Sequence, residues 1–327
     1  MTILVVGGAG YIGSNAVDAL IAQGYETVVV DNLVTGFREA VHKEARFYEG
    51  DIRDNSFLRS VFQKEDIEAV MHFAALSLGR ESMEQPLDYF SNNVGGTQVL
   101  LEVMEEFSVK NIVFSSSATV YGNTEKVPVK ETSALAPINP YGETKRMMET
   151  MMDWQSKAKG LRFIALRYFN VAGAKKDGTL GEVRQRLIPM ILQKALKDET
   201  MLLFGDDYDT PDGTCIRDFI HVLDLVEAHI LALNYLTNGG ESQILNVGSG
   251  KGCSNLEVVQ AARKVTKKPI PIKVKPRVKG DSAILVASND KIERLLNWHP
   301  AQSEIEEILT DAWRFQERYP FGYRNDR

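Results

Sequence analysis

Short runs of β-branched, aliphatic and aromatic residues recur along the first half of the chain, and amphipathic stretches separate them. The runs occupy residues 3–6, 26–30, 69–73, 111–115 and 162–166. Such runs are typical of buried strands, and the amphipathic stretches are typical of helices. Because parallel strands need a crossover connection, the alternation predicts an α/β fold: a doubly wound parallel sheet covered by helices on both faces.

The rhythm of strands and helices breaks near residue 174, where a polar, charge-rich segment begins. Later stretches such as 305–319 predict the small helices and strands of a second lobe. Alternation resumes within 218–250, which predicts that this segment returns to the main sheet. We therefore expect a main domain over residues 1–173 and a smaller C-terminal lobe over residues 174–327.

Composition and charge exclude several classes of protein. Hydrophobic residues make up 44% and charged residues 25% of the chain, and no apolar run approaches the roughly 18 residues of a membrane span. The chain begins with a strand pattern instead of a signal peptide, so we expect a cytoplasmic protein. Its net charge of −6, without a Lys/Arg-rich tract, predicts no binding to nucleic acid or membrane. Cys215 and Cys253 lack metal-site spacing, so we expect neither a metal site nor a disulfide framework.

A glycine-rich turn follows the first predicted strand. Gly7, Gly10 and Gly13 have the spacing G-x-x-G-x-x-G. Such a turn permits a tight bend and a close approach of the backbone to a pyrophosphate, which then lies at a helix N-terminus. A purely structural turn between a strand and a helix could carry the same glycines.

Acidic residues after two later strands bear on the choice of nucleotide. The second predicted strand ends in Asp31, about 20 residues beyond the glycines, where a carboxylate can accept both ribose hydroxyls and repel a 2′-phosphate. The combination predicts NAD in preference to NADP. Asp51 and Ile52 follow another predicted strand and are candidates for contact with adenine, although Asp51 could instead cap a turn.

A tyrosine and a lysine four residues apart are the strongest candidates for catalysis. Tyr141 and Lys145 share one face of a predicted helix. A tyrosine with a pKa near 10 is a poor base at neutral pH, but an adjacent ammonium group and a positive nicotinamide ring favour the phenolate. Tyr141 could then remove a hydroxyl proton while hydride leaves for NAD. Isolated Tyr-x-x-x-Lys pairs also occur on helix surfaces, so the pair gains weight from the glycine turn and Asp31.

Ser117, at the end of another predicted strand, is the candidate proton relay. Its hydroxyl could hydrogen-bond the reacting hydroxyl group and pass the proton to Tyr141. The alternative is a Ser/Thr-rich strand end that only satisfies loop amides.

Further motifs lie along nearly the whole chain, and together with those above they begin at Gly7, Asp31, His72, Asn92, Phe114, Pro140, Leu166 and Asp212. Jointly they resemble the extended short-chain dehydrogenase/reductase family, and within it the UDP-glucose/UDP-galactose 4-epimerases. The resemblance implies a Rossmann-type NAD-binding domain and a smaller substrate-binding lobe. It also implies that C4 of a sugar is oxidised, that the 4-keto intermediate turns over, and that hydride returns to its other face.

The resemblance also implies individual roles. It assigns Tyr141 as the base, Lys145 as its partner and Ser117 as the relay. Contacts to NAD are expected from Gly7, Gly10, Tyr11, Ile12, Gly13, Asp31, Asn32, Asp51, Ile52, Phe73, Ala74, Ala75, Asn92, Ser115, Tyr141, Lys145, Tyr168 and Phe169. Contacts to the nucleotide sugar are expected from Ser117, Tyr141, Asn170, Leu187, Leu202, Phe204, Arg217 and Asp281. A homodimer is expected through 83–101 and 147–154, whose apolar residues could instead be core.

Departures from the family pattern cluster in the expected substrate pocket. Phe219 replaces a usual tyrosine, Val278 replaces the second of two arginines, Arg80 replaces a glycine, and the segment around 183–186 is shortened. Losing one charged partner of a diphosphate weakens binding by about 1.5–3 kcal/mol. Three arginines could compensate, bind another anion or point to solvent: Arg80, Arg184 and Arg186.

The resemblance thus implies NAD-dependent 4-epimerisation of UDP-galactose to UDP-glucose, as part of galactose metabolism. The main alternative is a 4-epimerase of another nucleotide sugar or of a sugar that lacks UDP. A dehydratase would need a carboxylate pair beside the relay, and residues 117–119 contain none. A net dehydrogenase lacks a marked site for cofactor exchange, and a silent NAD-binding protein would not need Tyr141, Lys145 and Ser117.

Overall fold

The structure is a computed structural model of the whole chain and describes residues 1–124, 126–183, 186–277 and 282–323. The chain divides into two compact units, each assembled from three stretches. The first unit comprises Met1–Gly122, Ala134–Arg167 and Val226–Leu245, and the second comprises Asn123–Ser133, Tyr168–Leu225 and Asn246–Arg327. The functional division into a cofactor domain and a substrate lobe at residue 173 stays a prediction.

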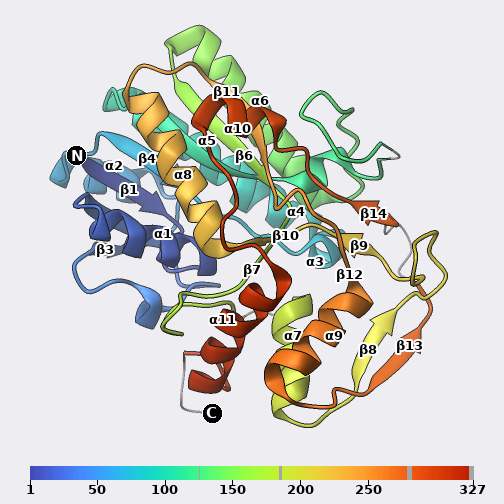
Figure 1. Cartoon of the computed structure of the whole chain (residues 1–327). Coiled ribbons are helices and arrows are strands. Elements are labelled where there is room, and N and C mark those ends of the chain that lie inside the picture. Colours follow the sequence, from blue (N-terminus) through green and yellow to red (C-terminus); the bar gives the residue numbers. More distant parts are fainter. Residues whose placement is uncertain (125, 184–185, 278–281, 324–327) are drawn as a thin grey trace. The chain divides into compact units, whose positions relative to one another are not determined.

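A seven-stranded sheet runs through the first unit (Figure 1), in the order β11-β6-β5-β4-β1-β2-β3. The pairs β1–β2, β1–β4, β2–β3 and β4–β5 are parallel. β1 therefore lies where the strand order reverses, the position at which open α/β sheets bind ligands beyond their carboxyl ends. The bounds are β1 Thr2–Val6, β2 Glu26–Asp31, β3 Arg46–Glu49, β4 Ala69–His72, β5 Asn111–Ser117, β6 Arg162–Tyr168 and β11 Gln243–Val247.

Helices cover both faces of this sheet. One face packs side chains such as Leu4, Val70 and Phe114 against α2, α5 and α6 in a continuous core. On the opposite face, Val29 packs near Val17 of α1 beside the glycine turn. The doubly wound α/β prediction is therefore confirmed. The bounds are α1 Tyr11–Ala22, α2 Asn55–Lys64, α3 Gly79–Glu84, α4 Pro86–Tyr89, a π-helix Phe90–Gly95, α5 Gly96–Glu106, α6 Pro140–Lys159 and α8 Val222–Thr237.

The described residues of the second unit form three small sheets and a separate helical core. β7 (Asn170–Ala172) pairs with β10 (Phe219–His221), and β8 (Met201–Phe204) pairs with β13 (Ile272–Lys275). The third sheet has the order β12-β9-β14, with bounds Cys253–Ser254, Ile216–Arg217 and Ile284–Leu285. Residues 219–221 thus pair with β7, whereas β11 lies in the seven-stranded sheet. The apolar core joins α7 Leu187–Leu196, α9 Asn255–Thr266 and α11 Ile305–Arg318, and α10 spans Asp290–Leu296.

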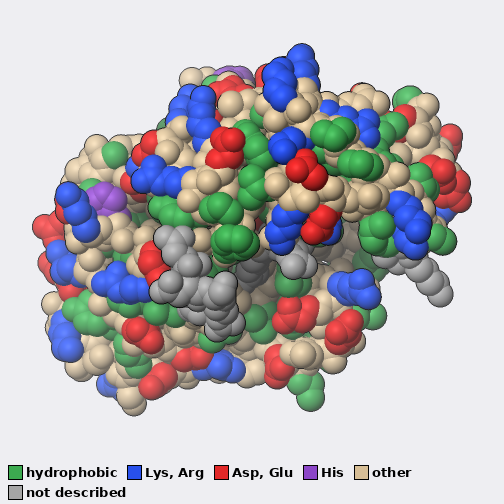
Figure 2. Space-filling model, turned by 90° about the horizontal axis from the view of Figure 1, so that it is seen from below, with side chains coloured by type: hydrophobic (Ala, Val, Ile, Leu, Met, Phe, Trp, Pro, Cys, Tyr) green, Lys and Arg blue, Asp and Glu red, His purple; other side chains and the backbone are tan. Residues whose placement is uncertain are grey.

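Short 3₁₀ helices complete the described elements of the first unit: η1 spans Arg38–Ala40 and η3 spans Ala118–Tyr121. Within the described ranges, no helix is long and apolar enough to cross a membrane. Figure 2 shows acidic and basic side chains interspersed over one face of the molecule. A net charge of −6 is consistent with such a mixed surface.

Candidate active site

The glycine turn between β1 and α1 has no room for larger residues. Gly7 has a φ of +84°, and a Cβ at Gly7 would lie 2.5 Å from the backbone nitrogen of Ala74. A Cβ at Gly13 would lie 2.1 Å from the carbonyl oxygen of Gly7. Gly10 is the N-cap of α1, and no described side chain caps this helix start. The first amides of α1, including those of Tyr11 and Ile12, therefore suit an anion such as a pyrophosphate.

Asp31 ends β2 and holds the glycine turn in place. Its Oδ2 atom accepts a hydrogen bond from the amide of Ala9 at 3.0 Å, and its Oδ1 atom accepts one from the amide of Leu33 at 2.9 Å. The side chain is 9% exposed. The carboxylate thus lies beside the backbone that follows the first glycines, as the predicted ribose contact requires.

Asp51, the predicted adenine neighbour, is engaged by residues of its own region. It accepts hydrogen bonds from the guanidinium and the amide of Arg53, at 2.7–2.9 Å, and from Asn32 at 3.2 Å. The hydrogen bonds from Arg53 lower the pKa of Asp51 to about 2, although partial burial opposes the shift. The turn-capping alternative is therefore observed, while the adenine contacts of Asp51 and of the buried Ile52 stay predictions.

The segment after β4 forms a backbone wall beside the glycine turn. Phe73 and Ala74 approach Gly7, and the ring of Phe73 packs 4.7 Å from that of His229. Asn93 fixes the following residues, because its side chain bonds both the amide and the carbonyl of Leu76 and also bonds Thr144 of α6. Sequence reasoning missed Asn93 as a site residue, although it is the second residue of the motif that begins at Asn92. The side chain of Asn92 donates a hydrogen bond to the Oδ1 atom of Asn93.

The tyrosine and the lysine lie on the first two turns of α6. Asn139 caps this helix by accepting a hydrogen bond from the amide of Gly142 at 2.8 Å, and Pro140 occupies its first position. The Nζ atom of Lys145 lies 5.9 Å from the centre of the Tyr141 ring. The cap and the proline therefore explain why α6 begins where it does, one residue before Tyr141.

Lys145 is buried, with 1% of its surface exposed. Its Nζ atom donates a hydrogen bond to the carbonyl oxygen of Ser115 at 2.6 Å and lies 4.8 Å from the centre of the Phe114 ring. Burial lowers the pKa of Lys145 to about 7, while the negative charge of Glu149 opposes the shift. These contacts hold Lys145 against the end of β5, because its hydrogen-bond partner Ser115 lies two residues before Ser117.

Ser117 ends β5 and is also buried. Its Oγ atom accepts hydrogen bonds from the amide of Thr119 at 3.2 Å and from the hydroxyl of Thr119 at 2.9 Å. Both contacts use acceptor capacity of the serine oxygen, so its own proton is available to a further acceptor. The loop-satisfying contacts that sequence reasoning considered are present, and they are compatible with a relay.

The residues predicted to contact the nucleotide sugar belong mainly to the second unit. The backbone amide of Asn170 donates a hydrogen bond to the backbone carbonyl of Asp218 at 2.9 Å, and the guanidinium of Arg217 donates one to the backbone carbonyl of Ser282 at 2.8 Å. Leu202 and Phe204 point outward on β8, at 38% and 42% exposure. Leu187 is the first residue of α7. Tyr168 and Phe169, which are predicted to contact NAD, are buried. Asp281 lies outside the described residues.

The described departures from the family pattern have identifiable surroundings. The side chain of Arg80 is 96% exposed and lies 4.0 Å from Glu84. Arg186 pairs with the buried Glu182 at 3.1 Å, and Phe219 is buried. Arg184 and Val278 lie outside the described residues.

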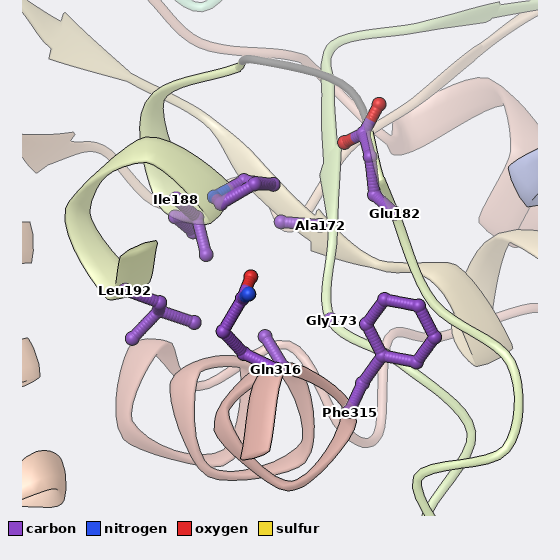
Figure 3. A pocket seen from close by; sticks show the side chains of 9 residues that line it. Ala172, Gly173, Glu182, Ile188, Leu192, Phe315 and Gln316 are labelled. Atoms are coloured by element: carbon purple, nitrogen blue, oxygen red, sulfur yellow. The ribbon is translucent and has the colours of Figure 1, made fainter. Parts of the chain in front are cut away.

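A small pocket in the second unit lies between α7 and α11 (Figure 3). Its lining is mainly apolar, and Gln316 points into the space between Ile188, Leu192 and Phe315. None of the lining residues belongs to the predicted sites. The lining residues are Ala172, Gly173, Glu182, Ile188, Pro189, Leu192, Ala312, Phe315 and Gln316.

Comparison with known proteins identifies relatives of this chain. Residues 3–248 match the NAD dependent epimerase/dehydratase family. The chain is 54% identical to a UDP-glucose 4-epimerase of Streptococcus mutans, over 99% of both chains. It also superimposes on a crystal structure of a UDP-glucose 4-epimerase with a TM-score of 0.97, at 51% identity over 99% of this chain and 100% of the other. A Bifidobacterium longum UDP-glucose 4-epimerase in complex with NAD+ and UDP gives a TM-score of 0.93, at 36% identity over 99% and 100% of the two chains.

Proposed function

This chain belongs to the NAD dependent epimerase/dehydratase family, and from that premise we propose that it interconverts UDP-galactose and UDP-glucose. The observation that carries the proposal is its 54% identity, over 99% of both chains, to a UDP-glucose 4-epimerase. The reaction is an NAD-dependent 4-epimerisation of a UDP-sugar. The glycine turn, the uncapped start of α1 and the position of Asp31 suit the dinucleotide.

Bound NAD supplies a hydride acceptor that later returns the same hydride, so the net reaction is an isomerisation. Tyr141 removes the proton of the sugar 4-hydroxyl, and Ser117 passes that proton between the sugar and Tyr141. Lys145 favours the phenolate form of Tyr141 by its charge, as its position 5.9 Å from the ring allows. When the 4-keto sugar presents its other face, Tyr141 returns the proton to the new hydroxyl.

Roles for the nucleotide half of the substrate rest on the resemblance. Arg217 is suited to a diphosphate because a guanidinium group can donate two parallel hydrogen bonds. In the present structure it donates to backbone carbonyls of its own unit. Asn170, Leu187, Leu202, Phe204 and Asp281 remain proposed contacts for uridine or diphosphate.

The chain acts as a homodimer in this proposal, and its location is the cytoplasm. Exposed apolar side chains support the dimer: Met83 is 63%, Leu87 is 79% and Trp154 is 65% exposed. They lie on α3, α4 and α6, and both α3 and α4 pack against α6. Large apolar side chains that a monomer leaves in water on neighbouring helices support a subunit interface at this place.

Proton NMR of purified protein incubated with UDP-galactose tests the proposed activity. We expect the anomeric signal of UDP-glucose to grow until a mixture is reached. A Tyr141→Phe variant loses the base and should convert substrate about 10²–10⁴ times more slowly. If UDP-galactose stays unchanged although NAD is bound, UDP-sugar epimerisation is wrong. The alternative is then 4-epimerisation of sugars without UDP. Phe219 and Val278 favour it, because they replace a tyrosine and an arginine of the family pattern.

A further inference from the structure

A buried carboxylate lies one helical turn beyond Lys145. Glu149 on α6 is 4% exposed. Its Oε1 atom accepts hydrogen bonds from the hydroxyl of Ser116 at 2.5 Å and from Nε of Arg167 at 2.9 Å, and its Oε2 atom accepts one from Nη2 of Arg167 at 2.6 Å. Three donors on two strands thus hold one carboxylate in a single orientation.

Arg167 extends this network to the segment that follows Ser117. Its Nη1 atom donates to the hydroxyl of Tyr121 at 3.0 Å, and its guanidinium lies 5.0 Å from the centre of that ring. Arg167 is 2% exposed on β6, and Tyr121 is 1% exposed in η3. Burial disfavours the positive charge of Arg167, but the hydrogen bonds to Glu149 and the negative charge of Glu149 raise the pKa of Arg167. The network therefore joins α6, β5, η3 and β6 within the first unit.

Stability alone is a weak reason for such a network. Taking an ion pair out of water carries a desolvation penalty that the mutual attraction often fails to exceed, and apolar replacements of similar volume are frequently as stable. A buried ion pair can instead fix the relative position of the elements that it joins. Here those elements are the helix of Tyr141 and Lys145 and the strand that ends in Ser117.

The charge of Glu149 also acts on Lys145. The groups around the ammonium are Tyr141 and Glu149 on α6, His72 on β4, and the Ser115 carbonyl and Phe114 ring on β5. His72 is neutral near pH 7, because burial and the charge of Lys145 lower its pKa to about 3. Glu149 is the carboxylate whose charge opposes the loss of a proton from Lys145.

We infer that Glu149, held by Arg167 and Ser116, is a positioning residue for epimerisation. It sets α6 against the end of β5, so that Tyr141 and Lys145 meet Ser117, and it supplies the buried counter-charge of Lys145. The inference rests on the proposed function, because 4-epimerisation is the reaction for which Tyr141, Lys145 and Ser117 are positioned. Its consequences for Tyr141 can be measured without substrate.

The principal variant is Glu149→Gln, which keeps the size of the side chain and removes its charge. We expect kcat to fall about 10–100-fold with KM nearly unchanged, because the reacting groups, and not the nucleotide contacts, are misplaced. Without the carboxylate Lys145 loses its proton at lower pH, so the alkaline limb of the kcat profile should move down by about one pH unit. Glu149→Asp keeps the charge and should restore most of the alkaline limb.

The matched control is Glu105→Gln. Glu105 also forms an ion pair with a residue of α6, Lys159, at 2.7 Å, but both side chains are largely exposed. This variant should keep the wild-type kcat and pH profile. Because Glu149→Gln leaves Arg167 buried without its partner and could fail to fold, Glu149→Gln/Arg167→Met removes the pair as a unit. It should fold and bind NAD, and still show the lower kcat.

A titration of Tyr141 separates this inference from the proposed function. The ultraviolet absorbance change of phenolate formation, taken as the difference between each protein and its Tyr141→Phe counterpart, reports the pKa of Tyr141 in the absence of sugar. We expect that pKa to be higher in Glu149→Gln than in the wild type. If the wild type does not convert UDP-galactose but this difference is present, the proposed function fails and the positioning role stands. Unchanged titration and an unchanged kcat profile in Glu149→Gln, or in the double variant if the single one does not fold, would overturn the inference.

Discussion

At the scale of single residues, burial changes the acid–base chemistry of two neighbours in the first unit. Lys145 has a pKa of about 7 because its ammonium is buried, and His72 has a pKa of about 3 because its ring is buried near that ammonium. The ring nitrogen Nε2 of His72 lies 2.9 Å from the hydroxyl of Thr97. Each group is therefore held in an environment that disfavours its charged form.

His72 should make stability fall in acid. Its pKa is about 3 in the folded chain and about 6.5 in the unfolded chain, so between these values the unfolded state binds a proton that the folded state does not. The contribution is present above pH 6.5 and is lost as pH falls through this window. From pH 7 to pH 5 we expect about 2 kcal/mol of unfolding free energy to be lost relative to His72→Gln.

Urea denaturation of both proteins at pH 7 and pH 5 measures this difference. His72→Gln retains a side chain that can bond Thr97, so the comparison isolates the titration. Parallel pH dependences of the two proteins would show that His72 is protonated in the folded state.

At the scale of elements, the start of α6 determines where the proposed catalytic pair of Tyr141 and Lys145 lies. Asn139 caps the helix, Pro140 occupies its first position, and Tyr141 follows within the same turn. Asn93 bonds Thr144 from the neighbouring helical segment and so braces the next turn. The position of Tyr141 therefore depends on the order of a helix terminus, which is normally the part of a helix that frays.

Asn139→Ala should weaken both the fold and the reaction. Losing an N-cap costs about 1 kcal/mol, and the freed first turn lets Tyr141 leave its reactive position, so kcat should fall about 3–10-fold. The control is Asp54→Ala, which removes the cap of α2, where Asp54 accepts a hydrogen bond from the amide of Phe57 at 3.0 Å. It should lower the melting temperature similarly and leave kcat unchanged. Equal kcat in the two variants would contradict a positioning role for the start of α6.

At the scale of the whole molecule, exposed apolar side chains bear on assembly. Trp154 of α6 is largely exposed, as are Met83 and Leu87 on the two short helices that pack against α6. The segments expected to form the dimer therefore carry side chains that a monomer would leave in water. Whether the chain pairs through them stays a prediction.

Leu87→Asp should prevent the proposed dimer from forming, because it would place a charge without a partner in the expected apolar interface. Size-exclusion chromatography with light scattering should then give the mass of one chain. Phe321→Asp is the control, since Phe321 is 74% exposed but lies in the second unit, outside the expected interface. A Leu87→Asp protein that keeps twice the chain mass would place the interface elsewhere.

Local patterns in the sequence were enough to predict the doubly wound sheet, the glycine turn and the Tyr141–Lys145 pair. Five apolar runs correspond to β1, β2, β4, β5 and β6, because buried parallel strands need continuous apolar residues. β3 was absent from those runs because its residues are exposed or half-buried. Gly7 and Gly13 could be read directly, because a Cβ at Gly7 would meet the backbone of Ala74 and a Cβ at Gly13 would meet the carbonyl oxygen of Gly7.

Only the tertiary structure decided which polar groups are buried and what they bond. Glu149 meets Arg167 across 18 residues, Asn93 meets Thr144 across 51, and Lys145 meets Ser115 across 30. No local pattern specifies such partners, because they come together only when strands and helices pack. The spacing of Lys145 and Glu149 places both on one helix face, but it does not reveal that the face is buried. The sequence thus determined the candidate reacting groups, and packing determined the burial and charges that adjust their chemistry.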